Sequence, residues 1–289
     1  MEVEIRTITK EEYPTGLNQI PQPPTQLWLR GSLPSPETKM LAVVGSRALT
    51  RYGRESCEYL INGLAGYPIS IISGLALGAD ACAHRAALAA ALHTIAIPGS
   101  GLSDEVIYPR TNIGLAQKIL EAGGALLSEH TPDHLARQYD FPSRNRIMVG
   151  LSDAVLMIEA GEKSGTLITA RLAADYNREL LCVPHRIKDV HSAGSHQFLR
   201  LGAQLVSEPE HILGALGISV PEAGAEIPQH QLLLLTEPEQ RVFELLSEPH
   251  ARDDLIRTAG MPVHEVLAAL SSMELKGFIK ESFGAWHRS

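Results

Sequence analysis

The sequence has 289 residues, of which 44% are hydrophobic and 20% are charged, a composition typical of a globular protein and too apolar for a disordered chain. The length allows one large α/β domain and a small second module. The formal net charge is −8, so any nucleic-acid site must be a local basic patch within an acidic surface.

The first residues, MEVEIRTITKEEYP, have neither a basic stretch nor an apolar stretch, so we expect no signal peptide. No run approaches the ~18 apolar residues that span a bilayer. The three cysteines are scattered in apolar surroundings and form no CxxC motif. We therefore expect a cytoplasmic protein without a membrane partner.

The predicted elements begin with a Pro- and Gln-rich N-terminal extension, residues 1–38, that contains one extended stretch at Leu27–Arg30. From Lys39 to Gly217, short apolar, β-branched runs alternate with segments of helical spacing. The predicted strands are 40–46, 69–74, 93–99, 124–129, 154–160, 179–184 and 203–208, and the predicted helices are 56–64, 79–91, 113–122, 144–151, 167–176 and 196–201. This alternation predicts an α/β fold with a doubly wound parallel sheet.

Residues 218–236 are polar and contain Pro and Gly, which is typical of a linker. Residues 237–289 then predict helices at Glu237–Leu246, Asp253–Thr258 and Pro262–Lys276, followed by a hairpin in GFIKESFGAWHR. This order indicates a winged-helix domain. The domain has six Lys or Arg against nine Asp or Glu, and its third helix offers one Lys and no Arg. We therefore expect it to contact protein or to regulate, and not to read a DNA sequence.

Small residues follow several predicted strands, and ligands of open parallel sheets bind at these carboxyl ends. The strand ends are Gly45-Ser46-Arg47, Ser73-Gly74, Pro98-Gly99-Ser100-Gly101 leading to Tyr108-Pro109, and Lys163-Ser164-Gly165-Thr166. One glycine-rich turn alone is ordinary turn chemistry. Several turns on one edge, with helix N-termini and basic residues beside them, predict a site for a phosphate chain. No GxGxxG or P-loop order is present, so an ATPase is not supported.

A second cluster is Phe141-Pro142-Ser143-Arg144-Asn145-Arg146. Guanidinium groups bind phosphates, and an aromatic ring stacks on an unpaired base. The alternative interpretation is that Phe141 packs in the core and that the arginines are solvated or paired with carboxylates. The residues alone leave both interpretations open.

The sequence resembles the DprA/Smf family in blocks that occur in the family's order and spacing. From about Leu41 to Val206 the blocks are VVGSR, SGLALGAD, PGSGL, LLSE, FPSRNRI, IEAGEKSGTLITARLA and LRLGAQLV. The resemblance implies an extended Rossmann-like fold that binds single-stranded DNA, protects incoming DNA and loads the RecA recombinase onto it during natural transformation. It also implies a homodimer, with Gly202–Leu216 as a candidate contact surface. Carried onto matching positions, the nucleic-acid-binding residues are Ser46, Arg47, Gly74, Phe141, Arg144, Asn145, Arg146, Lys163, Ser164 and Thr166.

The chain departs from the family pattern in one loop. His185 stands where the family usually has Gly, and Gly194-Ser195-His196 replaces a G-[SC]-N turn. Together with His191, these histidines lack HExxH spacing and cysteine partners, so we expect no metal site.

An enzyme is the alternative class of function. The order of an arginine-bearing helix, an acidic strand end and Ser-Gly-Thr also resembles nucleotide phosphoribohydrolases of the lysine-decarboxylase-like group. There, Glu159 would hold a ribose hydroxyl and Arg144 a phosphate, but the turn EAGEKSGT lacks the paired glycines of that group. No catalytic set emerges, and we expect neither an enzyme nor a cofactor.

Overall fold

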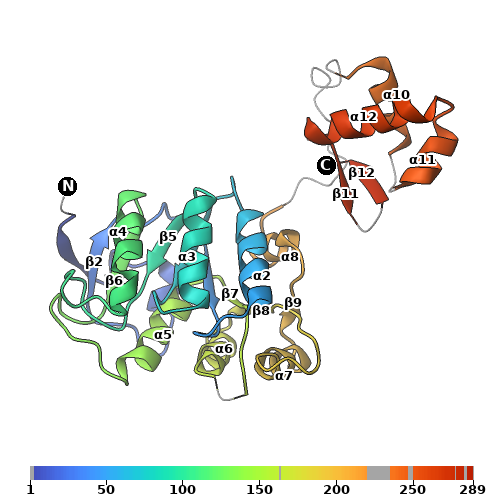
Figure 1. The fold of residues 1–289 in the computed structure, drawn as a ribbon. Helices are drawn as coiled ribbons and strands as arrows, with labels where there is room; N and C mark the ends of the chain where they lie inside the picture. The colour runs from blue at the N-terminus through green and yellow to red at the C-terminus, as the bar shows by residue number, and fades with distance from the viewer. Residues whose placement is uncertain are drawn as a thin grey trace. The chain divides into compact units, whose positions relative to one another are not determined.

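The apolar runs of the first part of the chain form a nine-stranded sheet, in the order β1-β2-β6-β5-β4-β3-β7-β8-β9 (Figure 1). The computed structural model describes residues 3–162, 164–219, 235–246, 250–276, 278–282 and 285–288. Contacts divide the chain into two units, Met1–Ile218 and Ser219–Ser289. The seven strands from β6 to β9 in the sheet order are parallel to one another. Strand β2 pairs antiparallel with β6, and β1 pairs antiparallel with β2. The predicted α/β fold is confirmed.

Each of the seven predicted strands overlaps one parallel strand of the sheet. The strands are β1 (Ile5–Ile8), β2 (Leu27–Gly31), β3 (Lys39–Val44), β4 (Ile69–Ser73), β5 (His93–Ala96), β6 (Ala125–Ser128), β7 (Ala154–Met157), β8 (Glu179–Cys182) and β9 (Gln204–Leu205). The helices are α1 (Thr15–Asn18), α2 (Arg51–Asn62), α3 (Ala79–Ala89), η1 (Arg110–Asn112), α4 (Ile113–Glu121), α5 (Asp140–Leu151), α6 (Thr166–Asp175), α7 (Ala193–Arg200) and α8 (Pro209–Ala215).

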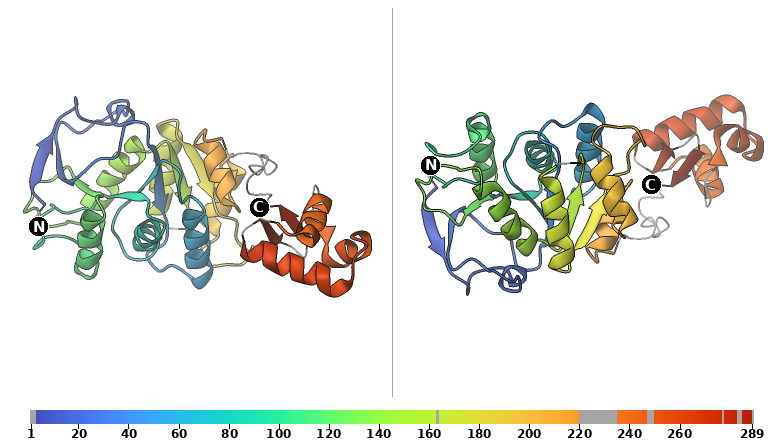
Figure 2. Two further views of the ribbon diagram at one scale, coloured as in Figure 1. Left: turned by 90° about the horizontal axis from the view of Figure 1, so that it is seen from above. Right: turned by 90° about the horizontal axis from the view of Figure 1, so that it is seen from below.

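The strand order reverses between β3 and β7. From β3 the chain proceeds outwards through β4, β5 and β6, and it then returns to β7 on the other side of β3. Because parallel crossovers are right-handed, the two halves place their helices on opposite faces. Figure 2 shows α2, α3 and α4 on one face and α5 and α6 on the other. The reversal leaves a crevice at the carboxyl ends of β3 and β7, the position where such sheets bind ligands.

The N-terminal segment belongs to the sheet. The sequence predicts residues 1–38 as an extension that packs on the main domain and forms no domain of its own. In the structure β2 pairs with β6, with Trp28 opposite Ser128, and β1 covers the outer edge of β2. The short helix α1 packs on α5 and buries Leu17. Arg178 donates from Nη2 to the carbonyl of Gly16 at 3.0 Å. The segment therefore completes one side of the domain.

Helix α5 begins four residues earlier than predicted. The sequence predicts a helix that starts at Arg144, but α5 begins at Asp140 and includes Pro142. Proline is tolerated in a first turn because the N–H that it lacks would have no partner there. Phe141 consequently lies in the first turn of a helix and not in a loop.

The second unit has the predicted winged-helix order, with one additional short strand. Its elements are α10 (Glu237–Leu245), β10 (His250–Ala251), α11 (Arg252–Thr258), α12 (Val263–Leu275), β11 (Ile279–Ser282) and β12 (Ala285–Arg288). The strands pair in the order β10-β12-β11. Val242, Leu255, Leu270 and Trp286 belong to its buried core. Residues 220–234, most of the predicted linker, lie outside the described residues. None of the described helices combines the length and apolar character that crossing a membrane requires.

Candidate nucleic-acid interface

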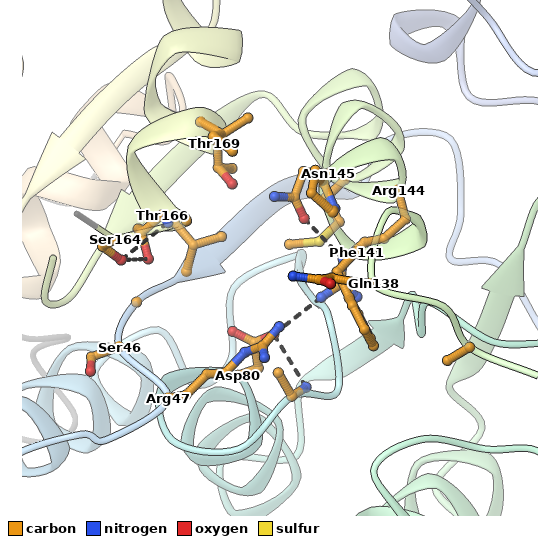
Figure 3. Close-up of a pocket in the computed structure, with 18 of the residues that line it drawn as sticks. Ser46, Arg47, Asp80, Gln138, Phe141, Arg144, Asn145, Ser164, Thr166 and Thr169 are labelled. Atoms are coloured by element: carbon orange, nitrogen blue, oxygen red, sulfur yellow. Dashed lines mark hydrogen bonds and ion pairs between the residues drawn. The ribbon is translucent and has the colours of Figure 1, made fainter.

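A pocket of about 820 Å³ opens at the reversal of strand order (Figure 3). Its size is within the roughly 300–1,000 Å³ of ligand sites in proteins. Its wall is built by the turn after β3, the turn before α6 and one side of α5. The lining residues include Gly45, Ser46, Arg47, Asp80, Tyr108, Gln138, Phe141, Arg144, Asn145, Met148, Ser164, Gly165, Thr166 and Thr169.

An exposed cation and two aromatic rings meet at the pocket. The Cζ atom of Arg47 lies 5.2 Å from the ring centroid of Phe141, a cation–π distance. The ring of Tyr108 is 5.6 Å from that of Phe141 and 48% of the Tyr108 residue is exposed. The ring of Phe141 packs directly against Gly99, because a Cβ atom added at residue 99 would lie only 2.8 Å from the ring. The arrangement presents flat apolar surface beside a positive charge.

Arg144 lies beneath this surface and is buried. Its Nη1 donates to the carbonyls of Gly74, at 2.6 Å, and Ile97, and Nε donates to Asn145 Oδ1 at 2.9 Å. Nη2 is 3.8 Å from Asp80 Oδ2. The guanidinium therefore ties strand ends to α5, and a Cβ atom at Gly74 would overlap it.

The ionic states of this pair follow from burial. Desolvation lowers the pKa of Arg144 to about 10, although Asp80 opposes the change. Desolvation likewise raises the pKa of Asp80, and Arg144 partly reverses that effect. Arg144 stays cationic at neutral pH and contributes a fixed positive charge at the pocket floor.

The start of α6 forms the opposite wall. Thr166 N donates to Ser164 Oγ at 3.2 Å, and the amides of Leu167 and Ile168 donate to the carbonyls of Ser164 and Gly165. Ser164 Oγ also donates to Thr166 Oγ1 at 2.9 Å. An anion at this wall would meet the positive end of the helix dipole and the Thr166 hydroxyl.

The structure brings together seven of the ten predicted residues. Those that line the pocket are Ser46, Arg47, Phe141, Arg144, Asn145, Ser164 and Thr166. Gly74 lies against Arg144 without lining the pocket. Arg146 is outside the lining and binds Glu129, with 2.5 Å from Nη2 to each carboxylate oxygen. Lys163 lies outside the described residues.

The prediction did not include Tyr108 and Gln138, which also line the pocket. The sequence could have indicated Tyr108, because this residue follows the glycine-rich end of β5, and the loops that follow parallel strands gather at one edge of the sheet. Gln138 had none.

His185 and His196, the two histidines that depart from the family pattern, make hydrogen bonds that stabilise the loop in which they lie. His185 donates to the carbonyl of Ile158 at 2.8 Å, and His196 donates to the carbonyl of His185 at 3.0 Å. Tyr52 packs edge-on against His185 and donates from its hydroxyl to the carbonyl of Pro184. Neither histidine lines the pocket.

Comparison with known proteins identifies the family. The sequence model of DNA recombination-mediator protein A matches residues 4–217, and that of the DprA winged-helix domain matches residues 221–284. The chain belongs to the DprA/Smf family. Protein Smf of Escherichia coli is 39% identical over 284 residues, which cover 96% of this chain and 75% of the relative. DNA processing protein DprA of Streptococcus pneumoniae is 38% identical over 207 residues, 72% of each chain.

Two solved DprA structures share the fold of this DprA/Smf chain. The structure of the S. pneumoniae protein matches with a TM-score of 0.68 at 36% identity, over 73% of this chain and 74% of that chain. DNA processing protein A of Helicobacter pylori matches with a TM-score of 0.64 at 31% identity, over 75% of this chain and 98% of that chain. The H. pylori structure concerns a single-stranded DNA binding mode.

Proposed function

We propose that this chain binds single-stranded DNA in the pocket at the strand-order reversal. The observation that carries the proposal is the contact between Arg47 and Phe141, with Tyr108 beside them. A cation next to the half-buried ring of Phe141 and the exposed ring of Tyr108 suits a strand whose phosphates and unpaired bases are both accessible. The single-stranded DNA binding mode of the H. pylori relative supports the same ligand.

In the proposed mode, the phosphate chain follows Arg47 and the start of α6, and a base stacks on Phe141. Arg144 acts from below, because its guanidinium holds Gly74, Ile97 and Asp80 while adding positive charge to the floor. Binding involves no covalent step. Arg146, engaged by Glu129, contributes through the position of α5 and not through a phosphate.

We propose that the site is not catalytic. Among its described lining residues, Asp80 is the one carboxylate, and it accepts hydrogen bonds from the amides of Gly74 and Ala76. The phosphoribohydrolase alternative needs Glu159, but this side chain accepts hydrogen bonds from the amide and hydroxyl of Thr50 at the start of α2. Glu159 thus holds the N-cap residue of α2 in place, and nothing observed favours the alternative.

We further propose that the chain, as a cytoplasmic homodimer, protects incoming DNA and loads RecA onto it during natural transformation. The family description as a recombination mediator supports this role. Pairing two subunits would lengthen the DNA footprint and add avidity. Assembly of RecA on oligo-dT coated with a single-strand binding protein, with and without this chain, tests the loading step, and sedimentation tests the dimer.

For the winged helix we propose a contact with protein. Lys276 directly follows α12, and its Nζ donates to Glu239 Oε1 at 2.6 Å. Arg288 stacks on Phe243, with Cζ 4.3 Å from the ring centroid. Two of its cations are therefore engaged within the unit, which supports a role other than reading the major groove.

Fluorescence anisotropy of labelled oligo-dT and of a duplex of equal length, in a salt series, tests the DNA proposal. We expect tighter binding of the single strand and a steep loss with salt. Arg47→Ala should weaken DNA binding. The control is Arg6→Ala, which removes the same charge from β1, where Arg6 pairs with Glu12, and this variant should bind DNA like the unaltered chain. Equal binding of single strand and duplex at low salt would reject the proposal.

A further inference from the structure

Two histidines and one aspartate gather between the end of β6 and the start of α5. His130 and His134 stack with ring centroids 4.1 Å apart and planes 15° apart. Both rings turn Nε2 towards the carboxylate of Asp140, the first residue of α5. Neither histidine is among the residues that line the DNA pocket.

The donor atoms have the spacing of a metal site. Nε2 of His134 is 2.8 Å from Asp140 Oδ2, and Nε2 of His130 is 3.7 Å from Asp140 Oδ1. Two ligands of a tetrahedral Zn²⁺ at 2.0–2.1 Å lie about 3.3 Å apart, a value between these two distances. All three donor atoms lie within 4.8 Å of one another. The two rings are nearly parallel, so their Nε2 lone pairs do not converge, and one ring must tilt out of the stack to bring all three donor atoms to one ion.

The approach of His130 to Asp140 is not a hydrogen bond. At 3.7 Å its Nε2 is beyond hydrogen-bonding distance of Asp140, yet the ring is held parallel to His134 and directed at the same carboxylate. A neutral imidazole carries its proton on either ring nitrogen, so both Nε2 atoms can bind a cation once the proton is on Nδ1.

The surroundings fit a bound divalent ion. The side chain of Asp140 is 2% exposed, and the amide of Arg137 donates to its Oδ2 at 2.7 Å. Such an outer contact orients a ligating carboxylate. The side chains of His130 and His134 are 25% and 22% exposed, which leaves a fourth position open to water. Glu129, the acidic neighbour of His130, is engaged by Arg146.

We propose that His130, His134 and Asp140 form a binding site for one divalent transition-metal ion, with Zn²⁺ as the best match to two imidazoles and one carboxylate. The ion would tie the end of β6 to the first residue of the helix that carries Phe141 and Arg144. It acts on the position of α5 and takes no part in chemistry.

Titration calorimetry of the untagged, chelator-treated full chain with ZnCl₂ tests the site without DNA, so its result is independent of the DNA proposal. We expect one tight ion per chain, and we expect Co²⁺ at the same site to give the visible bands of a tetrahedral complex. Loss of a hydrogen-bond partner of a ligating residue weakens metal binding about 10–100-fold. The double variant His130→Ala with His134→Ala removes two ligands themselves and should weaken Zn²⁺ binding at least about 100-fold.

His264→Ala is the matched control, because this exposed histidine lies on α12 in the other unit. Its binding should equal that of the unaltered chain. The proposal is overturned if the double variant binds Zn²⁺ as tightly as the unaltered chain, or if His264→Ala removes the tight site. The Co²⁺ spectrum of the unaltered chain needs no variant, and absence of tetrahedral bands would also overturn it.

Discussion

The guanidinium of Arg47 lies against the ring of Phe141, with Cζ 5.2 Å from the ring centroid. Arg47 follows β3 and Phe141 lies in the first turn of α5, so the contact joins both sides of the strand-order reversal. The charge that would meet a phosphate and the ring that would meet a base are thus held together before any ligand arrives.

Phe141→Ala should weaken binding of oligo-dT about 5- to 150-fold, because stacking on an aromatic ring contributes roughly 1–3 kcal/mol per base. Anisotropy measures the change. Tyr139→Ala is the control, since Tyr139 is 62% exposed in the same segment but outside the pocket lining. If both variants lose the same affinity, Phe141 is not a stacking residue.

Arg47→Ala and Arg146→Ala should differ in kind. Arg47→Ala should lower the salt dependence of binding, because each phosphate contact to a single strand contributes about 0.7 to the slope. Arg146→Ala should keep the slope but reduce stability by about 1–3 kcal/mol, because Glu129 loses its partner. Salt-series anisotropy and urea unfolding separate the effects. A lowered slope in Arg146→Ala would place that arginine on the DNA.

Gly74→Ala should displace Arg144, whose guanidinium occupies the space that the added Cβ atom needs. We expect a loss of about 1–3 kcal/mol in urea unfolding, the usual effect of overpacking, together with weaker DNA binding. Gly114→Ala in α4 meets nothing within 4 Å and should not destabilise the chain. Unchanged stability of Gly74→Ala would show that Arg144 is not fixed by this contact.

The winged helix should lose stability in acid through Glu239. Burial alone would raise the pKa of Glu239, but hydrogen bonds from Lys276, Ser272 and Thr236 lower it to about 2. An unfolded glutamate titrates near 4.3, so the stabilisation is complete above about pH 5 and is lost as the pH falls towards 2. Its size is on the order of 3 kcal/mol.

Trp286 can report this change, because it is one of two tryptophans and lies in the core of the winged helix. In a Trp28→Phe background, its fluorescence during urea unfolding should show a smaller pH dependence for Glu239→Gln. Glu237→Gln, whose side chain is 83% exposed, should behave like the parent. Identical acid profiles for Glu239→Gln and the parent would contradict the prediction.

The sheet was predictable because its parallel strands are buried on both faces and therefore appear as continuous apolar runs. The described elements without a predicted counterpart are short: β1, α1, η1 and β10 have two to four residues each. Hydrophobic periodicity needs a longer window to be recognised.

The site was predictable in outline, because parallel strand ends must meet at one edge. The direction of each side chain was not. Arg144 and Arg146 are two positions apart on α5, a rotation of about 200°, so one points to the pocket and the other to Glu129. The cluster of His130, His134 and Asp140 shows no motif either, because the path of a loop brings these residues together.

The pairing of β2 with β6 sets an order of events during synthesis. The strands β1 and β2 leave the ribosome before β6, the strand that anchors them to the sheet and that ends at Ser128. The contact of Gly16 with Arg178 must wait still longer. Synthesis runs from the N-terminus, so the residues made first are anchored only when most of the domain exists. Protection of the N-terminal strands from proteolysis would therefore report that the whole domain has folded.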